Sequence, residues 1–491
     1  MTNGPVLSKT RFMAGHQCPL QLWFKVNEKN APELEIDEVA RVRMDSGTRV
    51  GNVARNYYPG GLLIEGERYE YEKKCALTQE AIDAGTTVIY EAAFEHENTF
   101  VAIDILELEA DGWVIREVKS STGVKDEHIP DIAVQLMTAR AAGLQVGRAE
   151  VVFLNRDCKY PDLSNLFATE DVTTRVEELL ADLAVLERRL QLVMIQEKPE
   201  IEPGGHCDTP RDCPFKARCV PELPEHHVST LYRLGKEKAR SLVAQGVHTV
   251  DQIGAEVKLS ATAARQVDSV RTDQIVIEQG LRGELNTLSF PAAFLDFETV
   301  SMAIPEWDGC SPYTQVPVQF SCHVMAADGS IEHYEWLAEP GGDPRSALAE
   351  ALVNACEGAA SVVAYNAGFE RSCIKGLVNV RPELESELLS IAGKLVDLLP
   401  IVRNNVYHPQ FHGSFSIKSV LPALVPGAGY AELEVASGDV AALKLEQMMR
   451  GDLEGSTEEL REALLKYCEM DTYAMVELYH RLLEVADQAA A

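Results

Sequence analysis

The feature that most limits the fold is a pair of apolar, strand-like runs that carry acids between residues 91 and 119. Asp104 lies in the first run, and Glu117 and Lys119 lie in the second. In a β-strand, residues i and i+2 point to the same face, so Glu117 and Lys119 project together. A hairpin turn around Asp111 and Gly112 brings Asp104 beside them. The sequence therefore predicts an antiparallel hairpin on which two carboxylates and one ammonium converge.

This grouping suits metal-assisted hydrolysis of a phosphodiester bond. Carboxylates hold Mg²⁺ or Mn²⁺ through oxygen ligands, and the lysine orients or helps deprotonate the attacking water. The pattern resembles the core of the PD-(D/E)XK nucleases. That resemblance implies metal ligands at Asp104 and Glu117, a catalytic lysine at Lys119 and a further acidic ligand at Glu91. A surface hairpin with ordinary charges is the alternative, because the pattern alone is short.

Length and charge narrow the class of protein. A chain of 491 residues, 46% of them hydrophobic, is long enough for about three domains with cores of their own. The net charge of −31 argues against a chain that coats nucleic acid, but an enzyme can bind DNA through local basic grooves and metal ions. No run of eighteen apolar residues and no signal-peptide core is seen, so we expect a cytoplasmic protein with no membrane partner.

Periodicity and stop signals predict the elements around the hairpin. Helices are expected over 8–24, 36–58, 128–142 and 171–197, and strands between about 62 and 119. RecB-like nucleases, a branch of the same group, carry a Gln-x-x-x-Tyr motif on the helix after the lysine strand. Gln135 stands in the glutamine position and Ala139 in that of the tyrosine. The resemblance implies that Gln135 contacts the metal-bound water or the DNA backbone. Gly51 stands where many members have a histidine ligand, so one ligand is missing.

Three cysteines within thirteen residues, Cys207, Cys213 and Cys219, lie among prolines and polar residues too poor in apolar content for a core. Such cysteines are typical thiolate ligands for a metal, and Cys18 is the candidate for the fourth ligand. The set resembles the iron–sulfur nucleases of the RecB and CRISPR-associated exonuclease group, in which one cysteine precedes the nuclease core and three follow it. Both gaps are five residues here, where those relatives have two and five. The resemblance implies a 4Fe–4S cluster that staples the ends of the domain, with zinc as the alternative metal.

Residues 222–285 alternate helical stretches with glycines and resemble a helix-hairpin-helix module. Such modules contact the phosphate backbone through loop amides at a helix N-terminus. Arg233, Lys236, Lys238 and Arg240 are the basic residues expected to assist. A plain helical spacer is the alternative.

The third region, 286–491, carries acids in a second pattern. Asp296 and Glu298 lie at i and i+2 on an apolar strand, where a pair of acids is costly unless it binds a cation. Glu370 follows a later strand, and Tyr467 and Asp471 share one face of a late helix.

In this order the acids resemble the RNase H-like exonuclease fold of the DnaQ (DEDD) type. The resemblance implies two Mg²⁺ ions about 4 Å apart, held by the four carboxylates, with Tyr467 positioning the water. Glu370 replaces the usual aspartate of the second motif. Between these motifs, His408, His412 and Lys418 are candidates for phosphate binding.

The sequence thus predicts a multidomain α/β protein in three parts. Residues 1–221 form a restriction-endonuclease-like domain with the four-cysteine cluster, 222–285 a helical hairpin linker and 286–491 an RNase H-like domain. The chain as a whole resembles an uncharacterised bacterial family that joins such a nuclease to an exonuclease-like domain. The expected function is metal-dependent DNA hydrolysis in repair, processing or defence. A nucleic-acid-binding scaffold with an inactive exonuclease-like domain and an RNA-directed 3′–5′ exonuclease are the alternatives.

Overall fold

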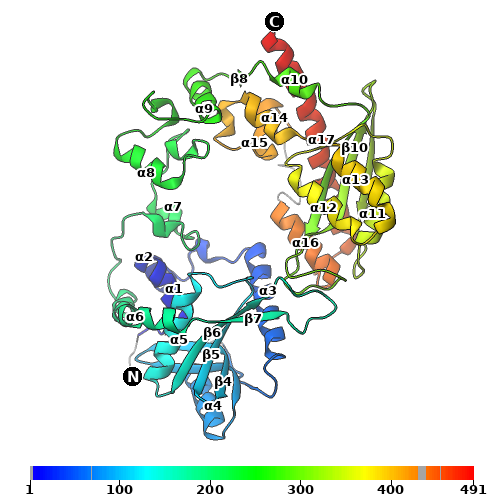
Figure 1. The fold of residues 1–491 in the computed structure, drawn as a ribbon. Helices are drawn as coiled ribbons and strands as arrows, with labels where there is room; N and C mark the ends of the chain where they lie inside the picture. The colour runs from blue at the N-terminus through cyan, green and yellow to red at the C-terminus, as the bar shows by residue number, and fades with distance from the viewer. Residues whose placement is uncertain (1–3, 68, 429–437, 454, 491) are drawn as a thin grey trace. The chain divides into compact units, whose positions relative to one another are not determined.

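The computed structural model describes residues 4–67, 69–428, 438–453 and 455–490. The chain separates into two compact units. The N-terminal unit comprises Met1–Glu222 and Met302–Thr314, and the C-terminal unit comprises Leu223–Ser301 and Gln315–Ala491. Both combine a β-sheet with helices (Figure 1), so the predicted mixed α/β class is confirmed.

The described strands of the N-terminal unit form one sheet with the order β2-β3-β4-β5-β6-β7 and with β1 beside β4. The strands are β1 (Leu7–Ser8), β2 (Leu62–Leu63), β3 (Val88–His96), β4 (Thr99–Glu109), β5 (Gly112–Lys119), β6 (Val146–Leu154) and β7 (Phe167–Asp171). Strands β3, β4 and β5 are antiparallel neighbours, and the turn between β4 and β5 contains Asp111, as predicted. Strand β6 runs parallel to β5, so the chain must cross over between them.

The helices of this unit match the predicted spans in most places. They are α1 (Lys9–Gln17), α2 (Pro19–Asn27), α3 (Glu38–Arg55), α4 (Tyr71–Asp83), α5 (His128–Ala141), α6 (Thr173–Val193) and α7 (Lys216–Cys219), with the short 3₁₀ turns η1 (Pro32–Leu34) and η2 (Gly205–Cys207). Two predictions were wrong. The expected helix over 8–24 is two helices, because Pro19 forces extended backbone on Cys18. The expected strands over 62–119 are interrupted by α4.

Helix α5 supplies the crossover between β5 and β6 and packs on the sheet (Figure 1). Its apolar residues, including Ile132 and Leu136, join those of β3, β4 and β6 in the main core of the unit. Helices α1 and α6 pack against α5. The carboxyl end of β5, where Glu117 and Lys119 lie, is therefore covered by α1 and α5.

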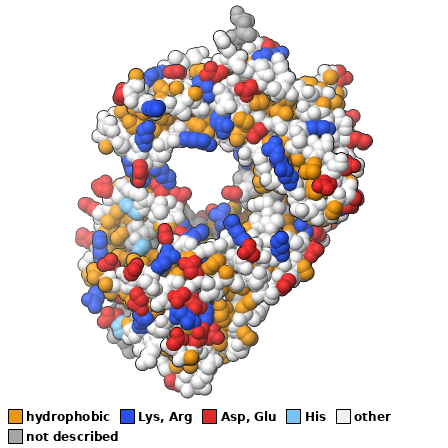
Figure 2. Space-filling view, viewed as in Figure 1, with side chains coloured by type: hydrophobic (Ala, Val, Ile, Leu, Met, Phe, Trp, Pro, Cys, Tyr) orange, Lys and Arg blue, Asp and Glu red, His pale blue; other side chains and the backbone are white. Residues whose placement is uncertain are grey.

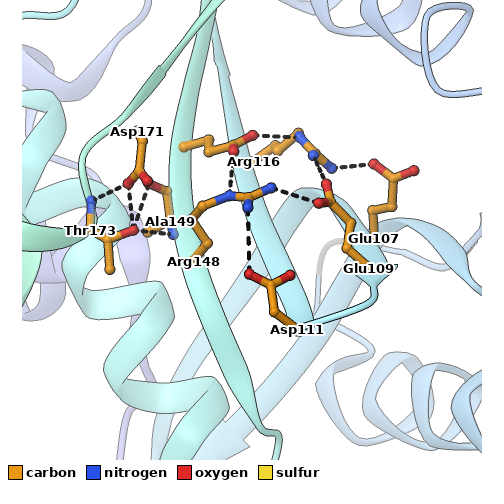
Figure 3. A network of polar contacts seen from close by, with 9 residues as sticks. Glu107, Glu109, Asp111, Arg116, Arg148, Ala149, Asp171 and Thr173 are labelled. Atoms are coloured by element: carbon orange, nitrogen blue, oxygen red, sulfur yellow. Dashed lines mark hydrogen bonds and ion pairs between the residues drawn. The ribbon is translucent and has the colours of Figure 1, made fainter.

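A network of ion pairs ties β4, β5 and β6 together (Figure 3). The Arg116 guanidinium contacts the carboxylates of Glu107, Glu109 and Glu150, the last at 2.8 Å. Arg148 contacts Glu150 at 2.6 Å and Glu109 at 2.7 Å. Because Arg116 adjoins Glu117, this network fixes the register of the strands next to the predicted site.

Residues 302–314 leave the C-terminal unit and pack into the N-terminal one. Ala303 is buried in a small core with Val50, Leu154 and Leu166. The Tyr313 hydroxyl donates a hydrogen bond of 2.6 Å to the carbonyl of Ser120. This segment therefore completes the side of the unit where β5 ends, although the sequence placed it in the third region.

The C-terminal unit has a sheet whose described strands follow the order β11-β10-β9-β12-β13. The strands are β9 (Ala292–Val300), β10 (Val316–Met325), β11 (Ile331–Leu337), β12 (Ser361–Ala364) and β13 (Leu395–Asp397), with β8 (Val276–Ile277) and β14 (Val406–Tyr407) paired apart from them. Strands β10 and β11 are antiparallel to their neighbours, whereas β12 and β13 run parallel to β9. The carboxyl ends of β9, β12 and β13 consequently meet at one edge, where ligands bind in open α/β sheets.

Helices cover this sheet and form two further cores. They are α10 (Leu281–Leu285), α11 (Arg345–Ala355), α12 (Gly368–Val378), α13 (Glu385–Gly393), α14 (Leu398–Asn405), α15 (Ile417–Leu424), α16 (Gly438–Arg450) and α17 (Thr457–Ala490), with the turns η5 (Pro382–Leu384) and η6 (Pro409–Phe411). The long α17 packs along β9 and β10.

The predicted linker folds as part of the C-terminal unit, with η3 (Val228–Thr230), α8 (Lys236–Ala244), η4 (Val250–Gln252) and α9 (Ala261–Thr272) around a small core of its own. Gly235 caps α8 with a φ of +83°, a conformation open to glycine. Among the residues described, no helix is both long and apolar enough to cross a bilayer.

Candidate functional site

The predicted acids of the N-terminal unit begin with a strained pair on β3 and β4. The strand register passes from Tyr90 opposite Ile105 to Ala92 opposite Ile103, which leaves Glu91 beside Asp104. Glu91 has a φ of +56°. Such a conformation costs a non-glycine residue free energy and persists where the surrounding structure enforces it, often at a functional site. Glu91 and Asp104 line the same cavity, and the Glu91 carboxylate lies 2.8 Å from the Arg55 guanidinium.

Glu117 is the most heavily contacted acid of the site. Its Oε1 accepts hydrogen bonds from the Lys119 ammonium at 2.8 Å and from the Lys9 ammonium at 2.7 Å. Its Oε2 accepts a hydrogen bond of 2.7 Å from the amide of Gln135. Asp104 lies beside it and accepts a hydrogen bond of 2.8 Å from the backbone N–H of Val118. The hairpin thus brings together Asp104, Glu117 and Lys119.

Gln135 lies one turn after Asp131 on α5 and is fully buried. Its amide nitrogen donates to Glu117, but its Oε1 has no hydrogen-bond partner among the described residues. A buried acceptor without a partner is costly, so it favours a donor supplied by a water or a ligand. The Asp131 carboxylate accepts a hydrogen bond from Lys119.

The charges shift the pKa values of these groups in opposite directions. Burial raises the pKa of Asp104 to about 7, and the neighbouring Glu117 adds to the shift. Burial also disfavours the charged form of Glu117, but Lys119 and Lys9 outweigh that effect and lower its pKa. Burial pulls the pKa of Lys119 down, yet Glu117 and Asp131 leave it raised overall. Lys119 is therefore held as an ammonium, which suits orienting water or stabilising negative charge better than accepting a proton.

A cavity of about 330 Å³ joins these acids, and we call it the carboxylate pocket. Its lining includes Glu91, Asp104, Glu117, Lys119 and Gly51. Oxygen ligands of this kind suit Mg²⁺ or Mn²⁺. Gly51, which stands where related nucleases have a histidine, does face the same cavity as the acids. A Cβ added there would meet no atom within 4 Å.

Sequence reasoning missed two residues of this site, Lys9 and Asp131. The spacing of Asp131 and Gln135, four residues apart on one helix, could have identified Asp131, because such residues share a face. Nothing local could have identified Lys9. It reaches Glu117 because β1 pairs with β4 and so places the start of α1 beside the hairpin.

The four predicted cysteine ligands gather in one place in the N-terminal unit. Cys18, Cys207, Cys213 and Cys219 line one small cavity together with Phe24 and Phe215, and none forms a disulfide. Cys18 and Cys207 are each 7% exposed. Burial raises the pKa of Cys213, and the other three cysteines add to the shift. Four clustered thiols in an apolar setting fit a metal that neutralises their thiolates.

The distances between the thiol sulfurs bear on which of the two candidates, a zinc ion or an iron–sulfur cluster, the site can hold. Zinc bound at about 2.3 Å by four sulfurs would bring those sulfurs to within roughly 4 Å of one another. Within the described ranges, no three cysteine sulfurs lie within 4.8 Å of one another. A cluster of irons and sulfides holds its thiolates further apart than a single ion does. This spacing is compatible with an iron–sulfur cluster, and a single zinc ion would draw the sulfurs closer together.

The C-terminal unit contains a second group of acids. Asp296 and Glu298 on β9 and Asp471 on α17 offer carboxylate oxygens within 4.8 Å of one another. Burial raises the pKa of Asp296, and Asp471, Glu298 and Glu370 add to the shift. Burial and Asp471 raise the pKa of Glu298 to about 8. The three carboxylates are crowded in a way that a cation would relieve.

Glu370 lies in the first turn of α12, beyond the carboxyl end of β12, and is 3% exposed. Burial raises its pKa to about 7, and its Oε2 has no hydrogen-bond partner in the described chain. It contributes to the electrostatic environment of Asp296 but does not belong to the compact group of three carboxylates. Nearby, Asp397 caps α14 and accepts a hydrogen bond of 2.9 Å from the N–H of Asn366.

Tyr467 lies one turn before Asp471 on α17, and its hydroxyl hydrogen-bonds that carboxylate. The Lys418 ammonium donates a hydrogen bond of 3.1 Å to the Tyr467 hydroxyl, so Lys418 joins the acid group. His408 and His412 do not join it. His408 caps η6, and the ring of His412 stacks on His226 with a centroid distance of 5.1 Å.

The basic residues of the hairpin segment lie around the start of α8. Lys236, Lys238 and Arg240 are on the helix, and the Arg233 guanidinium lies over the Tyr232 ring at 5.3 Å. On the face drawn in Figure 2, Lys and Arg side chains lie among Asp and Glu side chains. Local basic groups therefore exist within a chain of net charge −31.

Comparisons with known proteins leave the chemistry open. Residues 293–416 match the model of a family described as a domain of unknown function, DUF2779. Uncharacterized protein UU173 of Ureaplasma parvum is 25% identical over 49% of this chain and 38% of its own length. Uncharacterized protein MG366 of Mycoplasma genitalium is 24% identical over 39% of this chain and 32% of its own. The chain thus spans less than two fifths of the length of these curated relatives.

One solved structure, titled crystal structure of SSO0001, aligns with 41% of this chain and 90% of its own at 11% identity. Its TM-score is 0.18, which does not establish a shared fold.

Proposed function

We propose that this chain is a metal-dependent nuclease that hydrolyses phosphodiester bonds of DNA. The observation that carries the proposal is the carboxylate pocket, where Glu91, Asp104 and Glu117 line one cavity with the Lys119 ammonium. A divalent ion held there would polarise the scissile phosphate and lower the pKa of a bound water. This combination of acids and lysine supports a PD-(D/E)XK-type site of the RecB-like branch.

The residues of this chain have separate parts in that chemistry. Glu91, Asp104 and Glu117 would hold the ion. Lys119, kept positive by Glu117 and Asp131, would orient the attacking water or stabilise the charge that develops on the phosphate. Gln135 holds Glu117 in place and has a free acceptor for a water proton.

The acids of the C-terminal unit are proposed as a second nuclease site that trims strand ends. Asp296, Glu298, Glu370 and Asp471 would hold Mg²⁺ or Mn²⁺, and Tyr467 would position the water. The strand order supports an RNase H-like fold of the DnaQ type, because it gathers the β9 acids, Glu370 and Asp397 at one edge. The four cysteines are proposed to hold an iron–sulfur cluster that joins α2 to the segment after α6.

Isosteric substitutions test the two sites separately. Asp104→Asn and Asp296→Asn remove one ligand charge each and leave the shape, so each should lower cleavage at its own site by at least about 100-fold. Loss of a merely supporting residue would cost 10–100-fold. Labelled single-stranded DNA, duplex DNA and RNA would be incubated with the full chain and Mg²⁺, Mn²⁺ or a chelator. Matched controls are Asp111→Asn in the β4–β5 turn and Asp328→Asn, an exposed residue before β11.

Each outcome has a distinct meaning. Full cleavage by a variant that carries both Asp104→Asn and Asp296→Asn would exclude both sites. Binding without cleavage by the unaltered chain would favour a nucleic-acid-binding scaffold. Cleavage of RNA alone, abolished by Asp296→Asn, would favour an RNA-directed exonuclease.

A further inference from the structure

A second cavity of about 450 Å³ is also lined by Glu117 and Lys119, and we call it the Lys25 pocket. It shares Glu117 and Lys119 with the carboxylate pocket, so the two cavities meet at the proposed catalytic residues. Its volume lies within the range of about 300–1,000 Å³ that is typical of small-molecule sites. Apart from Lys9 and Asp131, which pair with Glu117 and Lys119, the proposed metal chemistry uses none of its other residues.

Hydrogen bonds between separate segments hold the walls of this pocket in place. Helices α1 and α2 form one side, and the cysteine segment around Arg211 forms another. The Gln17 side chain donates hydrogen bonds to the carbonyls of His206 at 2.8 Å and Arg211 at 2.6 Å. These bonds fasten the cysteine segment to α1, which keeps the pocket formed.

Lys25 is a cation of this pocket to which no described residue offers a carboxylate contact. Lys9 and Lys119 are paired with Glu117, and Arg211 lies 3.7 Å from Glu127. Lys25 is half-buried and makes no hydrogen bond or ion pair with the described residues, and its electrostatic neighbours are the Cys213 thiol and the Arg211 guanidinium. A half-buried ammonium beside another cation would be stabilised by an anion.

Gln21 is the second unpartnered group. It lies one turn before Lys25 on α2, is 5% exposed and lines both this pocket and the cavity of the four cysteines. Its buried Oε1 has no hydrogen-bond partner within the described residues. A buried amide offers a donor and an acceptor together, which matches the edge of a nucleobase.

We propose that the Lys25 pocket binds one nucleotide of the substrate strand next to the scissile phosphate. Lys25 and Arg211 contact its phosphate, and Gln21 contacts its base. This inference rests on the proposed nuclease function and adds the direction in which the strand leaves the catalytic residues, toward the cysteine segment.

A methylphosphonate scan tests the phosphate contact. Fluorescein-labelled single-stranded oligonucleotides, each with one neutral methylphosphonate at a different position, would be titrated by anisotropy with Ca²⁺ replacing Mg²⁺ to suppress cleavage. For the unaltered chain, one position near the cleavage site should lower affinity about tenfold. Lys25→Met should lower affinity for the unmodified oligonucleotide by the same factor and show no further loss at that position.

Matched variants separate this contact from general charge and folding. Lys29→Met removes an exposed charge outside the pocket and should behave as the unaltered chain. Lys25→Arg keeps the cation and should restore sensitivity at the same position. Gln21→Leu should abolish the penalty of an abasic site at that nucleotide.

The outcomes distinguish the pocket from the nuclease site. If Lys25→Met keeps normal affinity or the normal methylphosphonate profile while the chain still cleaves DNA, the pocket proposal fails and the nuclease proposal stands. If the chain neither binds nor cleaves any oligonucleotide, both proposals fail.

Discussion

Glu91 lies beside Asp104 in the antiparallel β3–β4 pair, with a φ of +56° in the middle of a strand. The register places the two acids opposite each other, and the positive φ of Glu91 adds a local distortion at that point of the sheet. The Arg55 guanidinium, 2.8 Å from Glu91, offsets only part of the repulsion because both side chains reach solvent.

Replacing Glu91 by glycine should separate stability from metal binding. Glu91→Gly removes the backbone strain and one acid, so the free energy of unfolding should rise by about 1 kcal/mol. Affinity for Mn²⁺ should fall about tenfold, because a ligand is lost. Urea unfolding and Mn²⁺ titration would measure the two effects. Glu91→Ala should lose the affinity without the gain in stability, and unchanged Mn²⁺ binding in both variants would exclude Glu91 as a ligand.

Gly51 stands where many related nucleases have a histidine ligand, and a substitution at this position tests that correspondence. A side chain at this position of α3 has room, and it faces the cavity that contains Asp104 and Glu117. Gly51→His should raise Mn²⁺ affinity severalfold by adding an imidazole ligand. Gly51→Ala is the control, since it gains helix propensity of up to about 1 kcal/mol but adds no ligand. Equal Mn²⁺ affinities for the two variants would refute this placement of the imidazole.

The acids of the C-terminal unit should make the metal-free protein less stable as the pH rises. The pKa of Glu298 is raised to about 8 and that of Glu370 to about 7, both by burial. Between about pH 4.5 and these values the folded state binds more protons than the unfolded state, so stability is greatest below this window and is lost as the pH passes through 7–8.

Thermal unfolding with a chelator should therefore show Tm falling by at least about 3 °C between pH 5.5 and 8.5. Mg²⁺ or Mn²⁺ should reverse the fall, because the ion replaces the protons. Asp296→Asn should flatten the profile. A Tm independent of both pH and metal would argue against this group of acids as a cation site.

The cysteine cavity predicts a coloured protein after anaerobic purification. Cys213→Ser should abolish the broad absorption near 400 nm together with bound iron and sulfide, and should lower Tm, since the link between α2 and the later segment is lost. Cys75→Ser is the control, because Cys75 lies on α4 outside the cavity. A colourless protein with stoichiometric zinc would identify the site as a zinc site.

Local patterns predicted the elements that carry the chemistry. The period-two apolar runs predicted the β4–β5 hairpin, and the period of 3.6 predicted α3, α5 and α6. Helix α4 has only a weak apolar periodicity and lies between two strands, so the sequence does not separate it from them. Cys18 lies between two helices rather than inside one, because Pro19 favours extended backbone at the preceding residue.

The long-range contacts of the site could not be predicted from the sequence. The pairing of Lys9 with Glu117 spans 108 positions and depends on a two-residue strand, β1, that has no pattern of its own. The left-handed backbone of Glu91 has no signal in the residue type, because a glutamate rarely adopts a positive φ. The grouping of Cys18 with the three later cysteines could be predicted, because a metal site of this kind needs a fourth thiolate ligand whatever the fold.

The segment 302–314 limits how the two units can be exchanged as genetic modules. The chain passes between units after Glu222, after Ser301 and after Thr314. A gene fragment ending at 222 would encode the N-terminal unit without Ala303, which packs in a core with Val50, and without Tyr313, which hydrogen-bonds Ser120. Recombination at that boundary would leave an exposed apolar surface beside the lysine strand. Separate expression of the first unit would therefore need residues 302–314 grafted onto it.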